Sequence, residues 1–250
     1  RKALREVGIE NKIMSISVPV HKRLMHSISG DLTEQYYGKK NQAIYSVPRK
    51  ELNCMLMDLA EENGVKINFS NKCIDIDFEN TELKFKNSEG KKFDFVFGAD
   101  GAGSIVRKKM NLFSDLNVYT NIIDCGYKEL TIPPSNKGAW IIDSDALHIW
   151  PRESYMVMAL PNQDGSFTIT LFFPLKGKNS FENLKTNSDV NDFFSTKFPD
   201  LVPLIPNLSD QYFKNPVSSL GIIRCDSWKV NNFMLIGDSC HATVPFYGQG

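Results

Sequence analysis

The run from Phe233 to Gly250, FMLIGDSCHATVPFYGQG, constrains the fold more than any other part of the chain. Its four leading apolar residues predict a strand of a parallel sheet that is buried on both faces. In open α/β sheets, ligands bind beyond the carboxyl ends of such strands. We therefore expect Gly237 to let a ligand approach the backbone, and the Asp238 carboxylate to accept hydrogen bonds from ligand hydroxyl groups. Gly248 and Gly250 allow the loop that follows to turn tightly.

A second motif, GADGAGSIVR, occupies residues 98–107 and follows another apolar run, 93–98. This run also predicts a buried parallel strand. The glycines of the motif let a ligand lie close to the backbone, and a helix is expected to begin at Ser104. Asp100 and Arg107 are its polar members. The long stretch between the two motifs leaves room for an inserted domain.

The clearest helical pattern follows Pro48. Leu52, Met55, Leu56, Leu59 and Ala60 fall on one helical face. Pro48 suits the first turn of this helix, and Gly64 suits its C-terminal cap. Arg49 lies at the helix start, where a cation opposes the helix dipole, so its presence indicates a nearby anion.

The inserted segment, 115–225, predicts a mostly antiparallel sheet with one covered face. Pro161 to Gly165 is a hairpin turn signal. Met156, Met158 and Leu160 have the period of two that puts side chains on one face of a strand. A plain core strand would show the same period, so a purely structural interpretation stays open. The other expected elements are strands at 15–18, 24–28, 44–47, 65–69, 73–78, 83–86, 122–131, 146–150, 155–160, 166–173 and 217–224, and helices at 1–8 and 191–198.

Composition narrows the class of protein. The 250 residues are 42% hydrophobic and 23% charged, which is ordinary for a globular protein. The net charge is zero and no basic stripe occurs, which argues against nucleic acid as a partner. No apolar run approaches the ~18 residues of a membrane span. The five cysteines are scattered without ligand spacing, so we expect free thiols in a reducing compartment and no metal site.

The two motifs together resemble those of the class A FAD-dependent aromatic hydroxylases. The runs PVHKRLMHSISG, YYG and LHIWPR are most similar to the kynurenine hydroxylases within that family. The resemblance implies an α/β, glutathione-reductase-like FAD-binding fold, here partial, with an inserted mostly antiparallel β-sheet substrate domain. The FAD-binding domain would comprise 41–114 and 226–250, and the substrate-binding domain 1–40 and 115–225. The family's GxGxxG is absent, so we expect a fragment without that N-terminal unit and without the C-terminal part.

The resemblance also implies roles for particular residues. Arg23 and Tyr37 would bind the carboxylate of the substrate, for which a guanidinium fork is well suited. Pro245, Phe246 and Tyr247 would lie between substrate and flavin and exclude water. The histidines His26, His148 and His241 would be structural. The remaining expected substrate-binding residues are Leu147, Met156, Met158, Leu160, Thr170, Phe172 and Phe246. The expected cofactor-binding residues are Arg49, Cys73, Asp100, Gly101, Arg107, Gly237, Asp238, Pro245, Gly248 and Gly250.

The reaction implied by the resemblance is hydroxylation of L-kynurenine to 3-hydroxykynurenine, a step of tryptophan catabolism toward NAD. It would use bound FAD, NADPH as co-substrate and O2, through a flavin hydroperoxide and with no covalent catalytic residue. The alternatives are a related monooxygenase acting on another aromatic or polyene substrate, or a non-catalytic FAD-fold fragment. The compartment would be the cytoplasm, or the cytosolic face of the mitochondrial outer membrane in a eukaryote, with membrane contact only through a C-terminal segment. The oligomeric state is left open.

Overall fold

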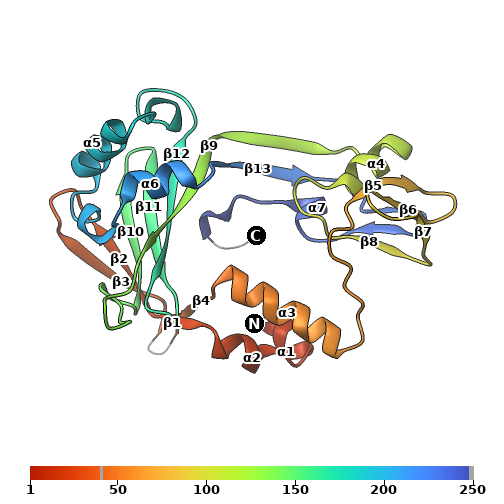
Figure 1. Ribbon diagram of the computed structural model, residues 1–250, viewed down its shortest axis with the longest axis horizontal. Coiled ribbons are helices and arrows are strands. Elements are labelled where there is room, and N and C mark those ends of the chain that lie inside the picture. Colours follow the sequence, from red (N-terminus) through yellow and green to blue (C-terminus); the bar gives the residue numbers. More distant parts are fainter. Residues whose placement is uncertain (40–41, 248–250) are drawn as a thin grey trace. The chain divides into compact units, whose positions relative to one another are not determined.

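The computed structural model describes residues 1–39 and 42–247, which form two compact units (Figure 1). Unit 1 comprises Arg1–Val65 and Asp124–Ser218, and unit 2 comprises Lys66–Ile123 and Ser219–Gly250. Each unit groups residues that contact one another closely. The expected FAD-binding and substrate-binding domains are defined instead by the ligand that each would hold, so their boundaries stay a prediction.

A seven-stranded sheet has the strand order β13-β9-β12-β11-β10-β2-β3, and its strands β12, β11, β10, β2 and β3 lie in unit 1. The pairs β9–β12, β12–β11, β11–β10 and β2–β3 are antiparallel, and β10–β2 is parallel. The prediction of a mostly antiparallel sheet is thus confirmed. The strands are β2 (Lys22–His26), β3 (Leu32–Tyr36), β9 (Tyr119–Ile132), β10 (Ala146–Arg152), β11 (Tyr155–Pro161), β12 (Phe167–Pro174) and β13 (Ser218–Arg224). Of these, β3 was not expected from the sequence.

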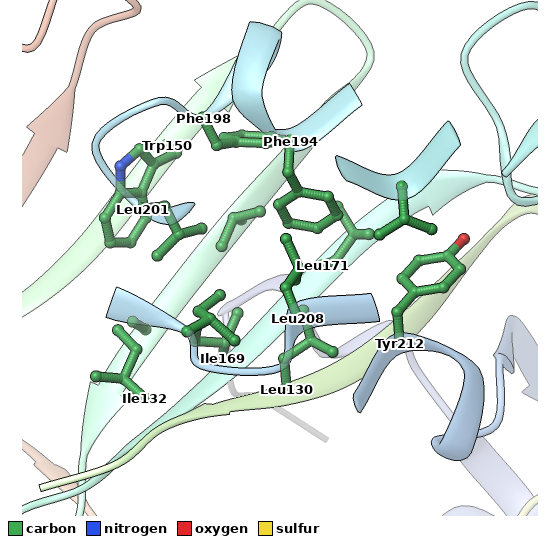
Figure 2. Close-up of a cluster of buried hydrophobic side chains, with 14 of the residues drawn as sticks. Leu130, Ile132, Trp150, Ile169, Leu171, Phe194, Phe198, Leu201, Leu208 and Tyr212 are labelled. Carbon is green, nitrogen blue, oxygen red and sulfur yellow. The ribbon is translucent and has the colours of Figure 1, made fainter. Parts of the chain in front are cut away.

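One face of this sheet is covered by helices α5 (Asn187–Lys197) and α6 (Leu208–Lys214) (Figures 1 and 2). Side chains from alternate positions of the strands meet Phe194 and Phe198 in one fully buried cluster. Each large apolar side chain buried there contributes about 1.5–3 kcal/mol. The strand members of the cluster include Leu130, Ile132, Trp150, Val157, Ile169 and Leu171.

Local signals fix the ends of the two covering helices. Thr186 and Asp189 form a capping box at the start of α5, each side chain accepting from the other's backbone N–H. At the end of α6, the buried Lys128 Nζ donates to the carbonyls of Tyr212, at 2.5 Å, and Asn215. A cation is favourable at a helix C-terminus, and burial lowers the pKa of this lysine. Helix α6 was not expected from the sequence, since its capping partner comes from a distant strand.

The rest of unit 1 consists of short elements and one longer helix. They are α1 (Lys2–Glu6), α2 (Glu10–Ser15), β1 (Val18–Val20), its antiparallel partner β4 (Ile44–Ser46), α3 (Arg49–Glu62), and the 3₁₀ turns η1 (Phe181–Asn183) and η2 (Val202–Leu204). Helix α3 confirms the pattern after Pro48, and Gly64 adopts a positive φ of 81° beyond its end. None of its residues is buried, so its apolar stripe is only partly covered. The expected strand at 65–69 is wrong, because this segment has no strand pairing.

Unit 2 contains two three-stranded sheets with orders β14-β15-β8 and β5-β6-β7. The strands β15 and β8 are parallel, as the two apolar runs predicted. The elements are β5 (Cys73–Asp77), β6 (Glu82–Phe85), β7 (Lys91–Lys92), β8 (Val96–Gly98), α4 (Ile105–Phe113), β14 (Lys229–Val230), β15 (Phe233–Leu235), α7 (Asp238–His241) and the 3₁₀ turn η3 (Pro245–Tyr247).

The expectation that both apolar runs are covered on two faces is wrong. Phe233 and Leu235 are fully buried against α4, whereas Phe97 and Met234 are 60% and 38% exposed. Phe95 and Ile236 are also exposed, so the second face of the β14-β15-β8 sheet is an apolar surface. A continuous run of apolar residues does not distinguish a strand that is covered on both faces from one that is covered on a single face, because it has no alternation of apolar and polar residues.

Gly98 explains the close packing of α4 on β8. A Cβ at this position would lie 2.9 Å from Val106 and 3.0 Å from Leu235. We predict that Gly98→Ala lowers the free energy of unfolding by about 1–3 kcal/mol, because the extra methyl overpacks the contact. Urea denaturation followed by circular dichroism measures this. Gly103→Ala is the matched control, since its added Cβ would meet no atom within 4 Å; equal losses in both variants would contradict the prediction.

Candidate functional site

The expected substrate-binding residues of the seven-stranded sheet lie on the face that α5 and α6 leave uncovered. Met156 pairs with Phe172, Met158 with Thr170, and Leu147 with Arg23, and residues in register share a face. Their neighbours along the strands, such as Val157 and Ile169, point the other way into the cluster of Figure 2. We call this surface the open face. It consists of Arg23, Leu147, Met156, Met158, Leu160, Thr170 and Phe172.

Arg23 and Tyr37 are in direct contact at one edge of the open face. The Arg23 Nε donates to the Tyr37 hydroxyl at 3.1 Å, and the guanidinium carbon lies 4.9 Å from the centre of the Tyr37 ring. Within residues 1–39 and 42–247, no carboxylate forms an ion pair with Arg23. The edge therefore presents a cation and a hydroxyl together, which is an arrangement suited to a carboxylate ligand.

A pocket of about 820 Å³ lies against the part of the open face that β11 and β12 form. Met158, Leu160 and Thr170 line it together with Arg49, the first residue of α3. An expected cofactor-binding residue and three expected substrate-binding residues therefore share one pocket in unit 1. Its other lining side chains include Glu129, Asn162, Gln163, Asp164 and Thr168. Sequence reasoning missed Glu129, although its alternation with the buried Leu130 would have placed it on this face.

The two aspartates of the sequence motifs follow neighbouring strand ends in unit 2. Gly98 at the end of β8 is in register with Leu235 at the end of β15. Gly101 and Gly237 have φ values of 76° and 61°, which non-glycine residues rarely adopt, and a Cβ on either would meet nothing within 4 Å. Asp238 begins α7 and is exposed. The backbone at these strand ends is therefore open to a ligand.

Asp100 and Arg107 are already used within unit 2. The Asp100 carboxylate accepts from Ile105 N at 2.8 Å, Val106 N at 3.2 Å and the Ser104 hydroxyl at 2.5 Å, so it caps helix α4. The buried Arg107 guanidinium donates to the carbonyls of Ser239, at 2.7 Å, and Ala102, at 2.5 Å. This arginine therefore connects the two motifs. A contact of either residue with a cofactor stays a prediction.

The remaining expected cofactor-binding residues are Cys73, Pro245, Gly248 and Gly250. Cys73 is partly buried at the start of β5, and burial raises the pKa of its thiol, which keeps it protonated at neutral pH. Pro245, Phe246 and Tyr247 form η3, while Gly248 and Gly250 lie outside the described residues.

In the part of the chain that the structure describes, no group of three or more His, Cys, Asp or Glu side chains could hold a metal ion, and no helix has the length and apolarity to cross a membrane.

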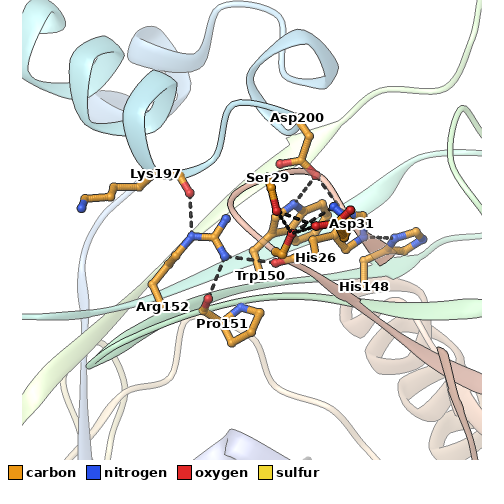
Figure 3. Close-up of polar contacts among 10 residues, drawn as sticks. His26, Ser29, Asp31, His148, Trp150, Pro151, Arg152, Lys197 and Asp200 are labelled. Atoms are coloured by element: carbon orange, nitrogen blue, oxygen red, sulfur yellow. Dashed lines mark hydrogen bonds and ion pairs between the residues drawn. The ribbon is translucent and has the colours of Figure 1, made fainter. Parts of the chain in front are cut away.

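Two of the histidines form a polar chain on the covered side of the sheet, away from the open face (Figure 3). Asp200 contacts His26 Nδ1, His26 Nε2 contacts His148 Nδ1, and His148 Nε2 contacts the Asp143 carbonyl, at 2.8–2.9 Å each. Burial lowers the pKa of both imidazoles and so favours their neutral forms. These side chains connect the sheet to the loop that carries Asp200. In unit 2, the His241 ring is tilted against that of Trp228, with 5.1 Å between the ring centres.

Comparison with known proteins gives consistent results for the whole chain. The family model described as "FAD binding domain" matches residues 2–250. A kynurenine 3-monooxygenase of Christiangramia forsetii is 45% identical over 100% of this chain, and one of Stenotrophomonas maltophilia is 39% identical over 100%. The chain spans 57% and 56% of the length of these two relatives.

Solved structures show the same fold. The 2-methyl-3-hydroxypyridine-5-carboxylic acid oxygenase has a TM-score of 0.76 and 19% identity, and the match covers 98% of this chain and 63% of that one. Klebsiella pneumoniae HpxO, complexed with FAD and uric acid, has a TM-score of 0.75 and 18% identity, covering 100% and 64%. These likenesses confirm the expected fold class, a partial FAD-binding α/β fold with an inserted antiparallel sheet.

The two hydrogen bonds that the Arg107 guanidinium donates to the carbonyls of Ser239 and Ala102 should stabilise the fold. Arg107→Met leaves two carbonyls without a donor, so the free energy of unfolding should fall by about 2–3 kcal/mol. Lys108→Met, at an exposed position of the same helix, should have little effect. Urea denaturation of both variants tests this, and similar midpoints would show that these hydrogen bonds contribute nothing.

The buried histidine pair predicts a pH dependence. Burial lowers the pKa of His148 from its ordinary 6.5 to about 4. Below pH 6.5 the unfolded chain binds a proton that the folded chain does not, so stability should fall as the pH drops toward 4, by up to about 3 kcal/mol from this group. Urea denaturation at several pH values should give a shallower slope for His148→Gln than for the wild type. Parallel slopes would contradict the assignment.

Proposed function

This chain belongs to the FAD-binding domain family, and from that premise we propose that the whole protein hydroxylates L-kynurenine to 3-hydroxykynurenine. The proposal is supported by the relatives at 39–45% identity, which are named kynurenine 3-monooxygenase. The chain spans little more than half of their length, so the activity is proposed for the whole protein. NADPH and O2 would be the co-substrates.

The observation that carries the proposal is the open face of unit 1. Arg23 and Tyr37 present a charged, hydrogen-bonding edge, and Leu147, Met158 and Leu160 continue it as an apolar surface on the same sheet face. A kynurenine molecule has a carboxylate at one end and an aromatic ring at the other. In this proposal the carboxylate binds the Arg23–Tyr37 edge, and the ring lies on the apolar surface.

In this proposal the strand ends of unit 2 hold FAD. Gly101 and Gly237 leave the backbone open there, and the exposed Asp238 carboxylate would accept hydrogen bonds from the sugar-type hydroxyls of FAD. Arg49 lines the pocket within unit 1, and its contact with FAD is proposed on the family resemblance alone. When bound, FAD supplies the redox chemistry that NADPH and O2 require.

The residues of the chain would act by positioning and by excluding water. No side chain of the open face is needed as a nucleophile, because the cofactor carries the difficult chemistry. Holding two reactants in the correct geometry can supply up to roughly 7–11 kcal/mol of the barrier. Met156, Met158 and Phe172 would orient the ring, and Pro245, Phe246 and Tyr247 would keep water from the reacting atoms.

Arg23→Ala in the full-length protein tests the carboxylate site. Losing a charged hydrogen-bonded contact should raise the KM for L-kynurenine by about 30-fold, roughly 2 kcal/mol, while FAD content stays the same. Steady-state NADPH consumption measures KM, and flavin absorbance after gel filtration measures FAD. Arg224→Ala, at an exposed position, is the control.

The activity itself is tested by NADPH consumption with L-kynurenine and, separately, with p-hydroxybenzoate. A hydroxylated product of L-kynurenine, identified by mass, is expected. Faster coupled turnover of p-hydroxybenzoate, or an unchanged KM in Arg23→Ala, would contradict the proposal.

A further inference from the structure

Beside the Arg23–Tyr37 edge lies a second polar pair, His21 and Asp145. The His21 Nδ1 contacts the Asp145 carboxylate. The backbone fixes this pair in place, because His21 N donates to the Asp145 carbonyl at 3.1 Å and Tyr37 N donates to the His21 carbonyl at 2.9 Å. Tyr37, His21 and Asp145 therefore lie side by side, each next to the end of one of the neighbouring strands β3, β2 and β10.

Tyr37 belongs to both polar pairs. Its hydroxyl accepts from Arg23, and its side chain lines a pocket of about 490 Å³ together with His21 and Asp145. His21 immediately precedes β2, in which Arg23 is the second residue. Tyr37 thus contacts the Arg23 guanidinium and shares the lining of this pocket with Asp145.

The Asp145 carboxylate retains capacity for a ligand. Its side chain is 48% exposed and that of His21 is 38% exposed. Among the described residues, His21 is its sole side-chain partner, and the nearby Lys22 is paired with Glu34 and Asp143 at 2.9 and 3.0 Å. An ionised carboxylate has about four acceptor sites, and within residues 1–39 and 42–247 a side chain contacts only one of the two Asp145 oxygens.

The spacing of these charges suits an amino-acid head group. Neighbouring strands are about 4.8 Å apart and residues rise by about 3.3 Å, so Asp145 and Arg23, one strand and two residues apart, have Cα atoms roughly 8 Å apart. The long arginine side chain and the shorter aspartate can then reach the two ends of a group that carries an ammonium beside a carboxylate.

We propose that Asp145, oriented by His21, binds the α-ammonium group of the substrate whose α-carboxylate binds Arg23 and Tyr37. This inference rests on the proposed function and deepens it. It makes Asp145 the residue that selects an α-amino acid over an aromatic acid lacking the amine. His21 is a positioning residue, because it acts through the carboxylate that it holds.

The test is Asp145→Asn in the full-length protein, assayed with two substrates. One is L-kynurenine and the other is its analogue without the α-amino group, 4-(2-aminophenyl)-4-oxobutanoate. Asp145→Asn should raise the KM for L-kynurenine by about 10-fold and leave the KM for the analogue within about twofold, because only the ammonium contact is lost. The wild type should prefer L-kynurenine to the analogue by a similar factor. His21→Gln should give a smaller change of the same selectivity.

Glu34→Gln is the matched control, since it removes an exposed carboxylate that Lys22 already pairs with. Its KM values should equal those of the wild type. An equal rise for both substrates, or no rise for either, in Asp145→Asn with normal FAD content would overturn the inference while leaving the proposed function intact. If the wild type hydroxylates neither substrate, the proposed function fails, and the assignment of Asp145 fails with it.

Discussion

The contact between the seven-stranded sheet and helices α5 and α6 determines the rest of unit 1. Burying Trp150, Val157 and Ile169 against Phe194 and Phe198 fixes which way each strand faces. Because side chains alternate, the same burial turns Met156, Met158 and Thr170 toward the open face. A slip of one residue in register would move the apolar cluster outward and the pocket side chains inward. The pocket is thus specified by the core behind it.

Much of this arrangement could be predicted from the sequence, and the failures have physical causes. The alternation in residues 155–160 and the turn at 161–165 located β11 and β12 within a residue or two. Strand β3 was missed because all of its residues are exposed, so it has no apolar pattern to signal it. The strand expected at 65–69 has a suitable composition but no partner. Composition describes what a segment favours, whereas pairing depends on distant residues.

Some contacts of the candidate site could be predicted from the sequence, and others could not, because they depend on which distant residues pair. The resemblance placed Arg23 and Tyr37 together, and the structure brings them into contact. Asp100 and Arg107 were also singled out, yet their side chains are committed to the cap of α4 and to the carbonyls of Ala102 and Ser239. Some polar residues of a motif that resembles a ligand-binding site can therefore serve to stabilise the loop itself. His21 and Asp145 escaped notice because they meet only through strand pairing.

The uncovered apolar surface of the β14-β15-β8 sheet has a practical consequence. Phe95, Phe97, Met234 and Ile236 expose hydrocarbon on a folded scaffold whose net charge is zero. Contiguous apolar patches of this kind attract one another in water, and a neutral surface offers no electrostatic repulsion to keep copies apart. The folded 250-residue chain should consequently self-associate in solution, so that its light scattering per molecule rises with protein concentration.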